Sequence, residues 1–232
     1  MKAVLLSAGL GKRLKSITDN IPKVMVPVNG KPCLEYNIEN LKRQGVSEFL
    51  INTHYLPEKI KEYFGDGSKF GVKISYSYEP MILGTAGALN NFKEELNDTF
   101  LVIYGDVISD IDILNALDIH KKNKAEATII LDKKRTLEGK GIVLREREEV
   151  IEFVEKPDKE IKNGLINSGV YILEPSILNI IKDGFSDFGK DILPSLAKEG
   201  KVFCEEHEGY IFDIGTEKDL IKTEDFFNGL EE

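Results

Sequence analysis

Short runs of Val, Ile, Leu and Phe alternate with amphipathic stretches along the first part of the chain. Such runs predict strands, and apolar positions three or four residues apart predict helices. The expected strands are Ala3–Leu6, Phe49–Thr53, Lys73–Ser77 and Phe100–Tyr104. The expected helices cover Leu34–Leu41 (ending before Gly45) and Pro57–Phe64, begin near Thr85, and run through Ile113–Leu117. This alternation is typical of an α/β fold with a largely parallel sheet.

The later part of the chain is richer in predicted strands. These are Ala127–Leu131, Gly141–Leu144, Val150–Val154, Ile166–Leu173, Val202–Cys204 and Tyr210–Asp213. Helices are expected at Pro175–Ile181, Asp191–Lys198 and Glu217–Phe227. Because no Pro/Ser-rich linker interrupts the pattern, we expect a single domain over residues 1–232, with one half at about 1–115 and the other at about 116–232.

Charge and cysteine content narrow the classes of function. The chain has 31 Lys and Arg against 40 Asp and Glu, a formal net charge of −9. Such an acidic chain lacks the clustered cations of a nucleic-acid-binding protein. Cys33 and Cys204 lie far apart, which argues against a disulfide scaffold or a zinc site and favours a cytoplasmic location. The apolar run Ala3–Leu6 is far shorter than the roughly 20 residues of a membrane span, so no membrane association is expected.

A glycine-rich segment, Leu6–Leu14, follows the first predicted strand, where an open α/β sheet binds its ligand. Leu14 stands where the dinucleotide fingerprint needs its third glycine, and Arg13 stands where a P-loop needs Ser or Thr. Glycines still allow backbone N–H groups to approach phosphate oxygens, and the cations Lys12, Arg13 and Lys23 would neutralise phosphate charge. The segment therefore favours a triphosphate site, with a tight strand-to-helix turn as the alternative.

Several blocks match one family in order. They are Leu6-Ser7-Ala8-Gly9-Leu10-Gly11-Lys12-Arg13-Leu14, Thr18, Pro22-Lys23, Pro27-Val28, Leu83-Gly84-Thr85-Ala86-Gly87-Ala88-Leu89, Tyr104-Gly105-Asp106, Phe153-Val154-Glu155-Lys156-Pro157 and Phe212-Asp213-Ile214-Gly215-Thr216. Together they resemble the signature of the sugar-1-phosphate nucleotidyltransferases. The resemblance implies a Rossmann-like three-layer α/β/α sandwich with a mixed, mostly parallel sheet. Because the blocks extend from Leu6 to Thr216, we expect no room for the C-terminal β-helix of longer relatives.

The resemblance also assigns roles. It implies that Arg13, Lys23 and Asp106 are catalytic and that Asp106 and Asp213 hold Mg²⁺ with the substrate phosphates. Nucleotide-binding residues would be Leu6, Ala8, Gly9, Gly11, Arg13, Lys23, Gly84, Thr85 and Ala86. Residues binding the sugar phosphate would be Gly141, Glu155, Lys156, Asn167 and Gly169. The chain departs from the family pattern at Ser7, Lys12, Ser16-Ile17 and Ile211.

The implied reaction joins a nucleoside triphosphate to a sugar 1-phosphate and releases pyrophosphate. Since the phosphate nucleophile is already anionic, no general base is needed, and His54, His120 and His207 are expected to be structural. The form Gly84-Thr85-Ala86-Gly87 favours GTP with mannose 1-phosphate or a manno-heptose 1-phosphate. A uridylyl- or thymidylyltransferase acting on glucose 1-phosphate or another sugar 1-phosphate is the alternative. Further alternatives are a non-catalytic regulatory member of the family and a glycosyltransferase using Asp110-Ile111-Asp112. The family also makes a homodimer reasonable.

Overall fold

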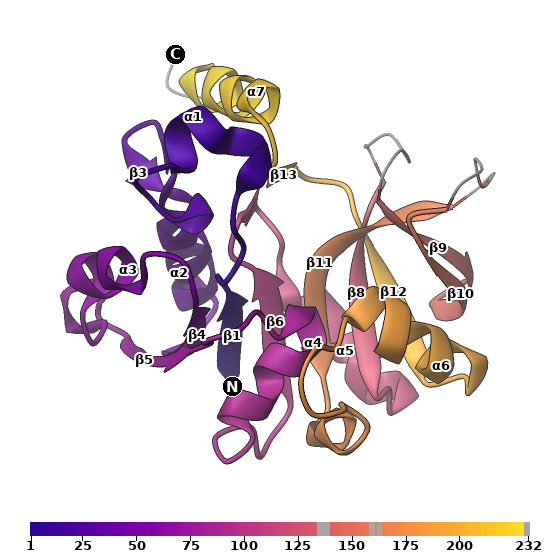
Figure 1. The fold of residues 1–232 in the computed structure, drawn as a ribbon. Coiled ribbons are helices and arrows are strands. Elements are labelled where there is room, and N and C mark those ends of the chain that lie inside the picture. The colour runs from indigo at the N-terminus through magenta and orange to yellow at the C-terminus, as the bar shows by residue number, and fades with distance from the viewer. Residues whose placement is uncertain (134–139, 158–160, 162–163, 230–232) are drawn as a thin grey trace. The chain divides into compact units, whose positions relative to one another are not determined.

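The computed structural model describes residues 1–133, 140–157, 161 and 164–229. The chain forms two compact units that are interleaved along the sequence (Figure 1). Unit 1 contains Met1, residues 83–102 and residues 111–209, whereas unit 2 contains residues 2–82, 103–110 and 210–232. The division falls inside strand β6 (Phe100–Tyr104). Each unit is therefore built from segments that are distant in the sequence.

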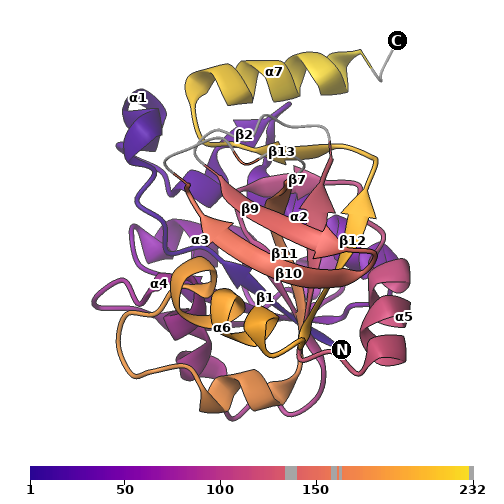
Figure 2. The ribbon, with the colours of Figure 1, turned by 90° about the vertical axis from the view of Figure 1, so that its right-hand side faces the viewer.

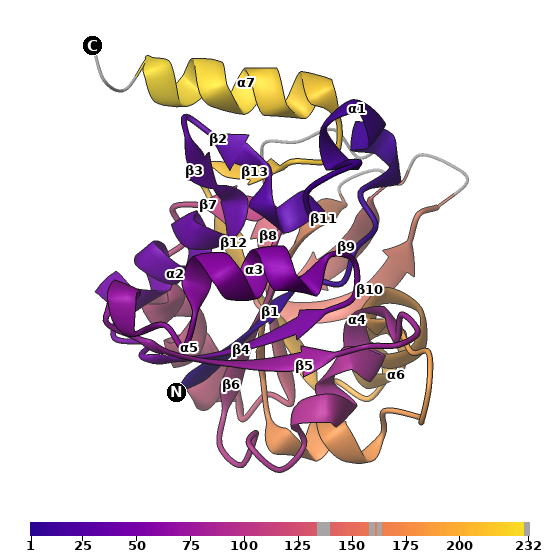
Figure 3. The same ribbon diagram turned by 60° about the vertical axis from the view of Figure 1, so that its left-hand side comes forward.

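Unit 2 contains a parallel ladder in the order β5-β4-β1, formed by β1 (Lys2–Leu6), β4 (Glu48–Thr53) and β5 (Lys73–Tyr78). Parallel neighbours need crossover connections, which here contain α2 (Cys33–Arg43) and α3 (Pro57–Phe64). Figure 3 shows both helices alongside these strands. The apolar side of α2 is buried through Leu34, Ile38 and Leu41, as the helical spacing predicts.

Shorter elements complete unit 2. They are η1 (Lys12–Leu14), α1 (Lys15–Thr18), η2 (Lys23–Met25), β2 (Pro27–Val28), β3 (Lys31–Pro32), η3 (Ser68–Phe70), β7 (Val107–Ser109), β13 (Ile211–Asp213) and α7 (Glu217–Asn228). Strands β2 and β3 form a hairpin whose turn residues Asn29 and Gly30 both have positive φ. Helix α7 packs against β13 and β2 (Figure 3). A core under these elements includes Leu14, Cys33 and Ile214.

Unit 1 contains strands in the order β11-β8-β12-β10-β9. These are β8 (Ala127–Asp132), β9 (Gly141–Glu146), β10 (Glu149–Glu155), β11 (Leu165–Leu173) and β12 (Val202–His207). Strands β8 and β12 are parallel and the other neighbours are antiparallel, so the expected mixed sheet is confirmed. Helices α5 (Ile113–Asn123) and α6 (Leu193–Lys198) pack on it, with α6 against β10 (Figure 2).

The remaining helical turns of unit 1 differ from the expected α-helices. The segment near Thr85 is a four-residue helix, α4 (Gly84–Gly87), continued by the 3-10 helix η4 (Ala88–Phe92). Residues expected as the helix Pro175–Ile181 form the 3-10 helix η5 (Pro175–Asn179). Of the expected helix Asp191–Lys198, the residues Leu193–Lys198 form α6, whereas Asp191 and Ile192 belong to the π-helix η6 (Phe188–Ile192), which precedes it. Helix α6 begins there because Pro194, which has no N–H, is tolerated only in the first turn.

Candidate active site

Asp106 and Asp213 come together in unit 2 through a short antiparallel ladder that the sequence did not reveal. Asp213, the last residue of β13, pairs with Val107, the first residue of β7 and the neighbour of Asp106. The Ile214 N–H donates to the carbonyl oxygen of Asp106 over 2.9 Å. The two backbones are thus locked side by side at the carboxylates. The structure brings together the two residues expected to share a metal ion.

Lys23 lies against both carboxylates. Its Nζ donates a hydrogen bond to Asp106 Oδ2 and is 3.6 Å from Asp213 Oδ1. The Lys23 side chain is only 11% exposed. Burial by itself lowers the pKa of Lys23, but the charges of Asp106 and Asp213 outweigh this effect, so the pKa is raised above its usual value. Lys23 is therefore a fixed cation at neutral pH and compensates part of the negative charge.

The glycine-rich loop leaves its backbone donors available. Gly11 has a φ of +63°, and a Cβ there would lie 2.9 Å from Thr18 Cγ2. The Leu14 N–H donates to Gly11 O over 2.8 Å and closes the turn. Within the described part of the chain, the N–H groups of residues 8–13 donate to no protein acceptor. Six successive free N–H groups suit a ligand with several anionic oxygens, which supports Ala8, Gly9 and Gly11 as phosphate-binding positions.

A buried polar chain holds the start of this loop, and sequence reasoning missed it. The Ser7 N–H donates to Asn52 Oδ1 over 2.7 Å, and Asn52 Nδ2 donates to Glu79 Oε1 over 2.7 Å. Ser7, Asn52 and Glu79 are all buried. The imidazole Nδ1 of His54 lies 2.7 Å from the carbonyl oxygen of Glu79. His54 thus belongs to the structural support of the loop, as expected for the histidines.

Gly105 sets the spacing between the loop and Asp106. Its N–H donates to the carbonyl oxygen of Leu6 over 2.9 Å. A Cβ on Gly105 would lie 2.9 Å from Leu6 O, Ser7 Oγ and Val24 Cγ1. Only glycine permits this approach, because real Cβ atoms do not come so close to backbone oxygen. Leu6, the end of β1, is therefore tied directly to the residue before the catalytic candidate.

Arg13 is exposed and lies beside the start of α7. A Cβ on Gly215 would be 3.3 Å from Arg13 Nη2 and 3.4 Å from Asp219 Oδ2. Thr216 caps α7 by accepting from the Asp219 N–H. The guanidinium thus lies against a glycine, close to the Asp213 block, with its charge accessible to a ligand.

The remaining nucleotide-binding candidates, Gly84, Thr85 and Ala86, lie in unit 1. They pack on the loop that precedes η6. The N–H groups of Ala86 and Gly87 both donate to Ser186 O over 3.0 Å. Gly84 has a φ of +78°, and a Cβ there would lie 2.4 Å from Ser186 O. This close backbone approach requires glycine at position 84.

Gly141, Glu155 and Lys156 also meet in unit 1. Gly141 pairs with Glu155 between β9 and β10, and a Cβ on Gly141 would lie 2.8 Å from Glu155 Oε2. Lys156 Nζ is 3.5 Å from Glu155 Oε1. Lys156 has a φ of +47°, which is unusual outside glycine, and its side chain is 66% exposed. A strained backbone that presents an exposed cation beside a carboxylate is consistent with a binding role.

Asn167 and Gly169 lie at a bulge in β11, where the pairing with β8 shifts between Asn167 and Val170. Asn167 Oδ1 accepts from the Gly169 N–H over 3.1 Å, and its Nδ2 donates to the Tyr171 hydroxyl over 2.6 Å. Gly169 adopts a φ of +82°. The Asn167 carboxamide therefore already stabilises the bulge, and any contact with a sugar would use its remaining hydrogen-bonding capacity.

Features behind the alternative functions have structural explanations. Asp112 caps α5 by accepting from the Leu114 N–H, and Asp110 Oδ1 accepts from the Tyr210 N–H. This confirms that Asp112 stands at the start of a helix. His120 is buried, with its two ring nitrogens 2.8 Å from Thr128 Oγ1 and 3.0 Å from Glu174 Oε1.

Both cysteine thiols are buried, and burial raises the pKa of Cys33 above its usual range and the pKa of Cys204 to about 12.

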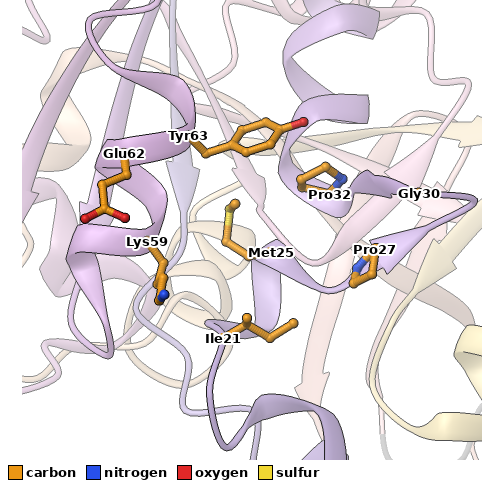
Figure 4. A pocket seen from close by; sticks show the side chains of 8 residues that line it. All are labelled: Ile21, Met25, Pro27, Gly30, Pro32, Lys59, Glu62 and Tyr63. Atoms are coloured by element: carbon orange, nitrogen blue, oxygen red, sulfur yellow. The ribbon is translucent and has the colours of Figure 1, made fainter.

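A cavity of about 490 Å³ lies in unit 2 next to η2, the short helix that carries Lys23. Figure 4 shows Met25 in the middle of the pocket, with Tyr63 on one side and Ile21 on the other. Its lining is Ile21, Met25, Pro27, Gly30, Pro32, Lys59, Glu62 and Tyr63. None of these is a predicted site residue, although Met25 belongs to the same short helix as Lys23.

Neither a metal-binding cluster of side chains nor a membrane-spanning helix is found in the described ranges of the chain. Residues 1–133, 140–157, 161 and 164–229 contain no cluster of three or more His, Cys, Asp and Glu that could bind a metal by themselves. Asp106 and Asp213 are a pair, which matches a cation bound jointly by protein and phosphate. Within the same ranges, no helix combines the length and apolar character needed to cross a membrane.

The fold and sequence have known relatives. The chain is 37% identical to a UTP–glucose-1-phosphate uridylyltransferase of Synechocystis over 88% of its length, covering 57% of that protein. It is 36% identical to the mannose-1-phosphate guanylyltransferase catalytic subunit beta of Dictyostelium discoideum over 95% of its length, covering 63% of that protein. The chain thus spans about three fifths of the curated relatives it matches.

A solved structure is similar over nearly the whole chain. HddC from Yersinia pseudotuberculosis, complexed with GMP-PN, superposes with a TM-score of 0.81 at 29% identity, covering 97% of this chain and 99% of that chain. The expected fold class, that of the nucleotide-diphospho-sugar transferases, is confirmed. The model of the family described as "Nucleotidyl transferase" matches residues 2–228. The chain therefore belongs to the nucleotidyl transferase family.

Proposed function

We propose that this chain transfers a nucleoside monophosphate from a nucleoside triphosphate to a sugar 1-phosphate, forming a nucleotide sugar and pyrophosphate. The observation that carries the proposal is the Lys23 ammonium held between Asp106 and Asp213, in the same unit as a loop with six free N–H groups. Cations and backbone donors are what a triphosphate requires, and the carboxylate pair is what its counterion requires. The family membership and the related enzymes support the same reaction class.

Catalysis in this proposal depends on alignment and charge. Arg13, Lys23 and the loop N–H groups bind the triphosphate and stabilise the charge that develops at the transferred phosphorus. Lys156 binds the phosphate of the sugar phosphate, and Glu155 accepts hydrogen bonds from sugar hydroxyls. The attacking oxygen is already anionic, so no proton needs to be removed. This accounts for histidines that are committed to structural contacts, such as His54 and His120.

Asp106 and Asp213 are the residues that would hold Mg²⁺. Mg²⁺ prefers one or two carboxylates together with substrate phosphates, and this pair already accommodates one cation, the ammonium of Lys23. When bound, the ion would neutralise phosphate charge and orient the transferred group. Lys23, whose ammonium lies beside this pair, could donate to a bound triphosphate.

We favour GTP with mannose 1-phosphate or a manno-heptose 1-phosphate. The Gly84-Thr85-Ala86-Gly87 block, the guanylyltransferase relative and the HddC complex with GMP-PN support this choice. The second candidate is UTP with glucose 1-phosphate, which is favoured by the 37% identity to a UTP–glucose-1-phosphate uridylyltransferase. The choice of base depends on a few hydrogen bonds. Homodimer formation and a cytoplasmic location stay predictions from the sequence.

The test is a matrix of substrates. Each of GTP, UTP, dTTP and ATP is incubated with Mg²⁺ and mannose 1-phosphate, glucose 1-phosphate or a manno-heptose 1-phosphate, and pyrophosphate release is measured. We expect the highest kcat/KM for GTP with a manno-configured sugar phosphate. Turnover with UTP but not GTP would overturn the base assignment. Asp106→Asn should lower kcat by about 100-fold or more, the order of loss for one electrostatic catalytic group.

The matched control is Asp110→Asn, because Asp110 belongs to the same short stretch and its Oδ1 accepts from the Tyr210 N–H, and it is not one of the predicted site residues. We expect near-normal turnover from this variant. Pyrophosphate release that needs no sugar phosphate, or transfer of a sugar to an added acceptor without free triphosphate, would contradict the proposed reaction.

A further inference from the structure

The carboxylate of Asp187 connects two groups of candidate residues within unit 1. Its Oδ2 accepts from the Thr85 hydroxyl over 3.0 Å, and its Oδ1 accepts from the Gly189 N–H over 3.0 Å. Thr85 Oγ1 in turn accepts from the Phe188 N–H over 2.9 Å. One oxygen of the carboxylate is thus used for the nucleotide-binding block and the other for the start of η6. Neither the composition nor the motif spacing singled out Asp187.

The segment Ser186–Gly189 lies close to Gly84 of the nucleotide-binding block and to Glu155 of the sugar-phosphate site. On the nucleotide side, a Cβ on Gly84 would lie 2.4 Å from Ser186 O. On the sugar-phosphate side, a Cβ on Gly189 would lie 2.5 Å from Glu155 Oε2. Gly84 meets a backbone oxygen and has a positive φ, so glycine is needed there, whereas a side chain at Gly189 would displace the Glu155 carboxylate. A displacement of this segment would be transmitted to Thr85 and to Glu155 together.

The backbone of the segment has unusual geometry. Asp187 is the N-cap of the π-helix η6, and its own N–H donates to Asp191 Oδ2 over 2.7 Å. π-helical turns are rare and are found often at functional sites. The Phe188 ring packs against Tyr171, with ring centroids 5.0 Å apart, and the Tyr171 hydroxyl accepts from Asn167. The segment therefore also reaches the β11 bulge.

We propose that Asp187 is a positioning residue that fixes the nucleotide-binding block, through Thr85, and the Glu155 side of the sugar-phosphate site, through Gly189, with a single carboxylate. The inference rests on the proposed function, because it assigns both groups to substrates of one reaction. Asp187 does not act on the reacting atoms in this proposal. Its effect is to make the geometry of one substrate site depend on the geometry of the other.

Four variants separate this role from simple stability. Asp187→Ala removes both acceptors, whereas Asp187→Asn keeps one oxygen for Gly189 and offers an amide to the Thr85 hydroxyl. Thr85→Val removes the bond to Asp187 and the acceptor of the Phe188 N–H, leaves the Gly189 bond to Asp187 in place and keeps the shape of the side chain. Ser186→Ala is the matched control, because the Ser186 hydroxyl is buried, 1% exposed, and has no hydrogen-bond partner in the described structure.

The first readout is amide hydrogen exchange of the free protein, which does not depend on any reaction. Asp187→Ala should increase exchange in peptides covering residues 83–88 and 188–192 together, while Asp187→Asn and Ser186→Ala should resemble the parent. If Asp187→Ala leaves either segment unchanged, the positioning role is wrong. This result stands even if no substrate pair is turned over, so failure of the proposed function is recognised separately.

The second readout is steady-state kinetics with the best substrate pair. Asp187→Ala should raise KM for both substrates by about tenfold, and Thr85→Val should raise only the KM for the triphosphate. Asp187→Asn should restore both KM values to within about threefold of the parent. Equal loss of kcat in all variants with unchanged KM values, or a KM change confined to one substrate in Asp187→Ala, would overturn the proposal.

Discussion

At the scale of single residues, the ionic contacts of Lys23 matter both for the stability of the fold and for the proposed binding of phosphate. In this structure the ammonium interacts with two carboxylates that are each only about one fifth exposed, 21% for Asp106 and 18% for Asp213. Removal of a charge from such a partly buried group leaves its partners insufficiently neutralised. Lys23 therefore contributes to folding as well as to the proposed binding of phosphate.

Lys23→Met should lower the free energy of unfolding by about 1–3 kcal/mol at pH 7, the usual cost of losing a hydrogen bond to a charged group. The pKa of Lys23 is raised in the native state, so its stabilising contribution is complete below the pKa of an unfolded lysine, about 10.4. The contribution is lost as the pH rises through the raised native pKa. The stability difference between parent and variant should be level up to about pH 10 and shrink above it. Urea denaturation at several pH values measures this.

Lys59→Met is the control, because Lys59 is exposed on α3 and has no described ion pair. Its stability difference from the parent should be small at every pH. A Lys23→Met protein as stable as the parent at pH 7 would show that the carboxylates need no partner in the fold.

Motifs identified the residues that carry charge, whereas the residues that hold them in place could not be predicted. Arg13, Lys23, Asp106 and Asp213 stand in family blocks, and unit 2 brings the last three into contact. Asn52 and Asp187 carry no such mark. Their roles come from hydrogen bonds to Ser7 and Thr85, which are distant in the sequence. A polar residue that bonds a distant backbone has no characteristic spacing, so only the structure reveals it.

At the scale of elements, Gly105 is the junction between β6 and β7 and the support of Asp106. Gly105→Ala should destabilise the protein by about 1–3 kcal/mol, because the added methyl group meets two oxygens and a valine methyl at 2.9 Å. Gly9→Ala is the matched control in the nearby loop. A Cβ on Gly9 has no described atom within 4 Å, and its φ is not positive.

Thermal unfolding of these two variants provides the comparison. Gly9→Ala should be neutral or slightly stabilising, since alanine restricts the unfolded chain more than glycine does. Similar melting temperatures for both variants would mean that the backbone between β6 and β7 adjusts to the added methyl group. The close approach at Gly105 would then contribute little to stability.

Elements with an apolar run or a helical period were predictable, including the three-residue strand β13, which was expected at Tyr210–Asp213. The expected strand Phe100–Tyr104 and helix Pro57–Phe64 agree with the structure at both ends. Strand β7, with three residues, is too short to show alternation, yet it aligns Asp106 with Asp213. The π-helix Phe188–Ile192 was missed for a different reason. The segment carries a cap at Asp187 and lies close to Glu155 at Gly189, and a helical period encodes neither contact.

At the scale of the whole molecule, the free protein should be indifferent to chelators. Asp106 and Asp213 share the Lys23 ammonium, so the fold needs no divalent ion to offset their repulsion. We expect EDTA to leave the melting temperature of the free protein unchanged. Mg²⁺ should raise it only when a nucleoside triphosphate is also present, because a ligand stabilises the state to which it binds.

Differential scanning fluorimetry with Mg²⁺ alone, GTP alone and both together is the measurement. A fall in melting temperature on addition of EDTA alone would contradict this prediction and would indicate a resident structural metal.

The interleaved construction of unit 2 has a consequence for the protein as it is synthesised. Residues 2–82 leave the ribosome before residues 103–110 and before β13, which pairs with β7, yet the unit needs all three segments. Contacts between such distant segments form slowly, and until then apolar surface stays exposed to chaperones and proteases. Translation that stops before residue 213 would yield a chain without the second carboxylate and without the strand that covers β7.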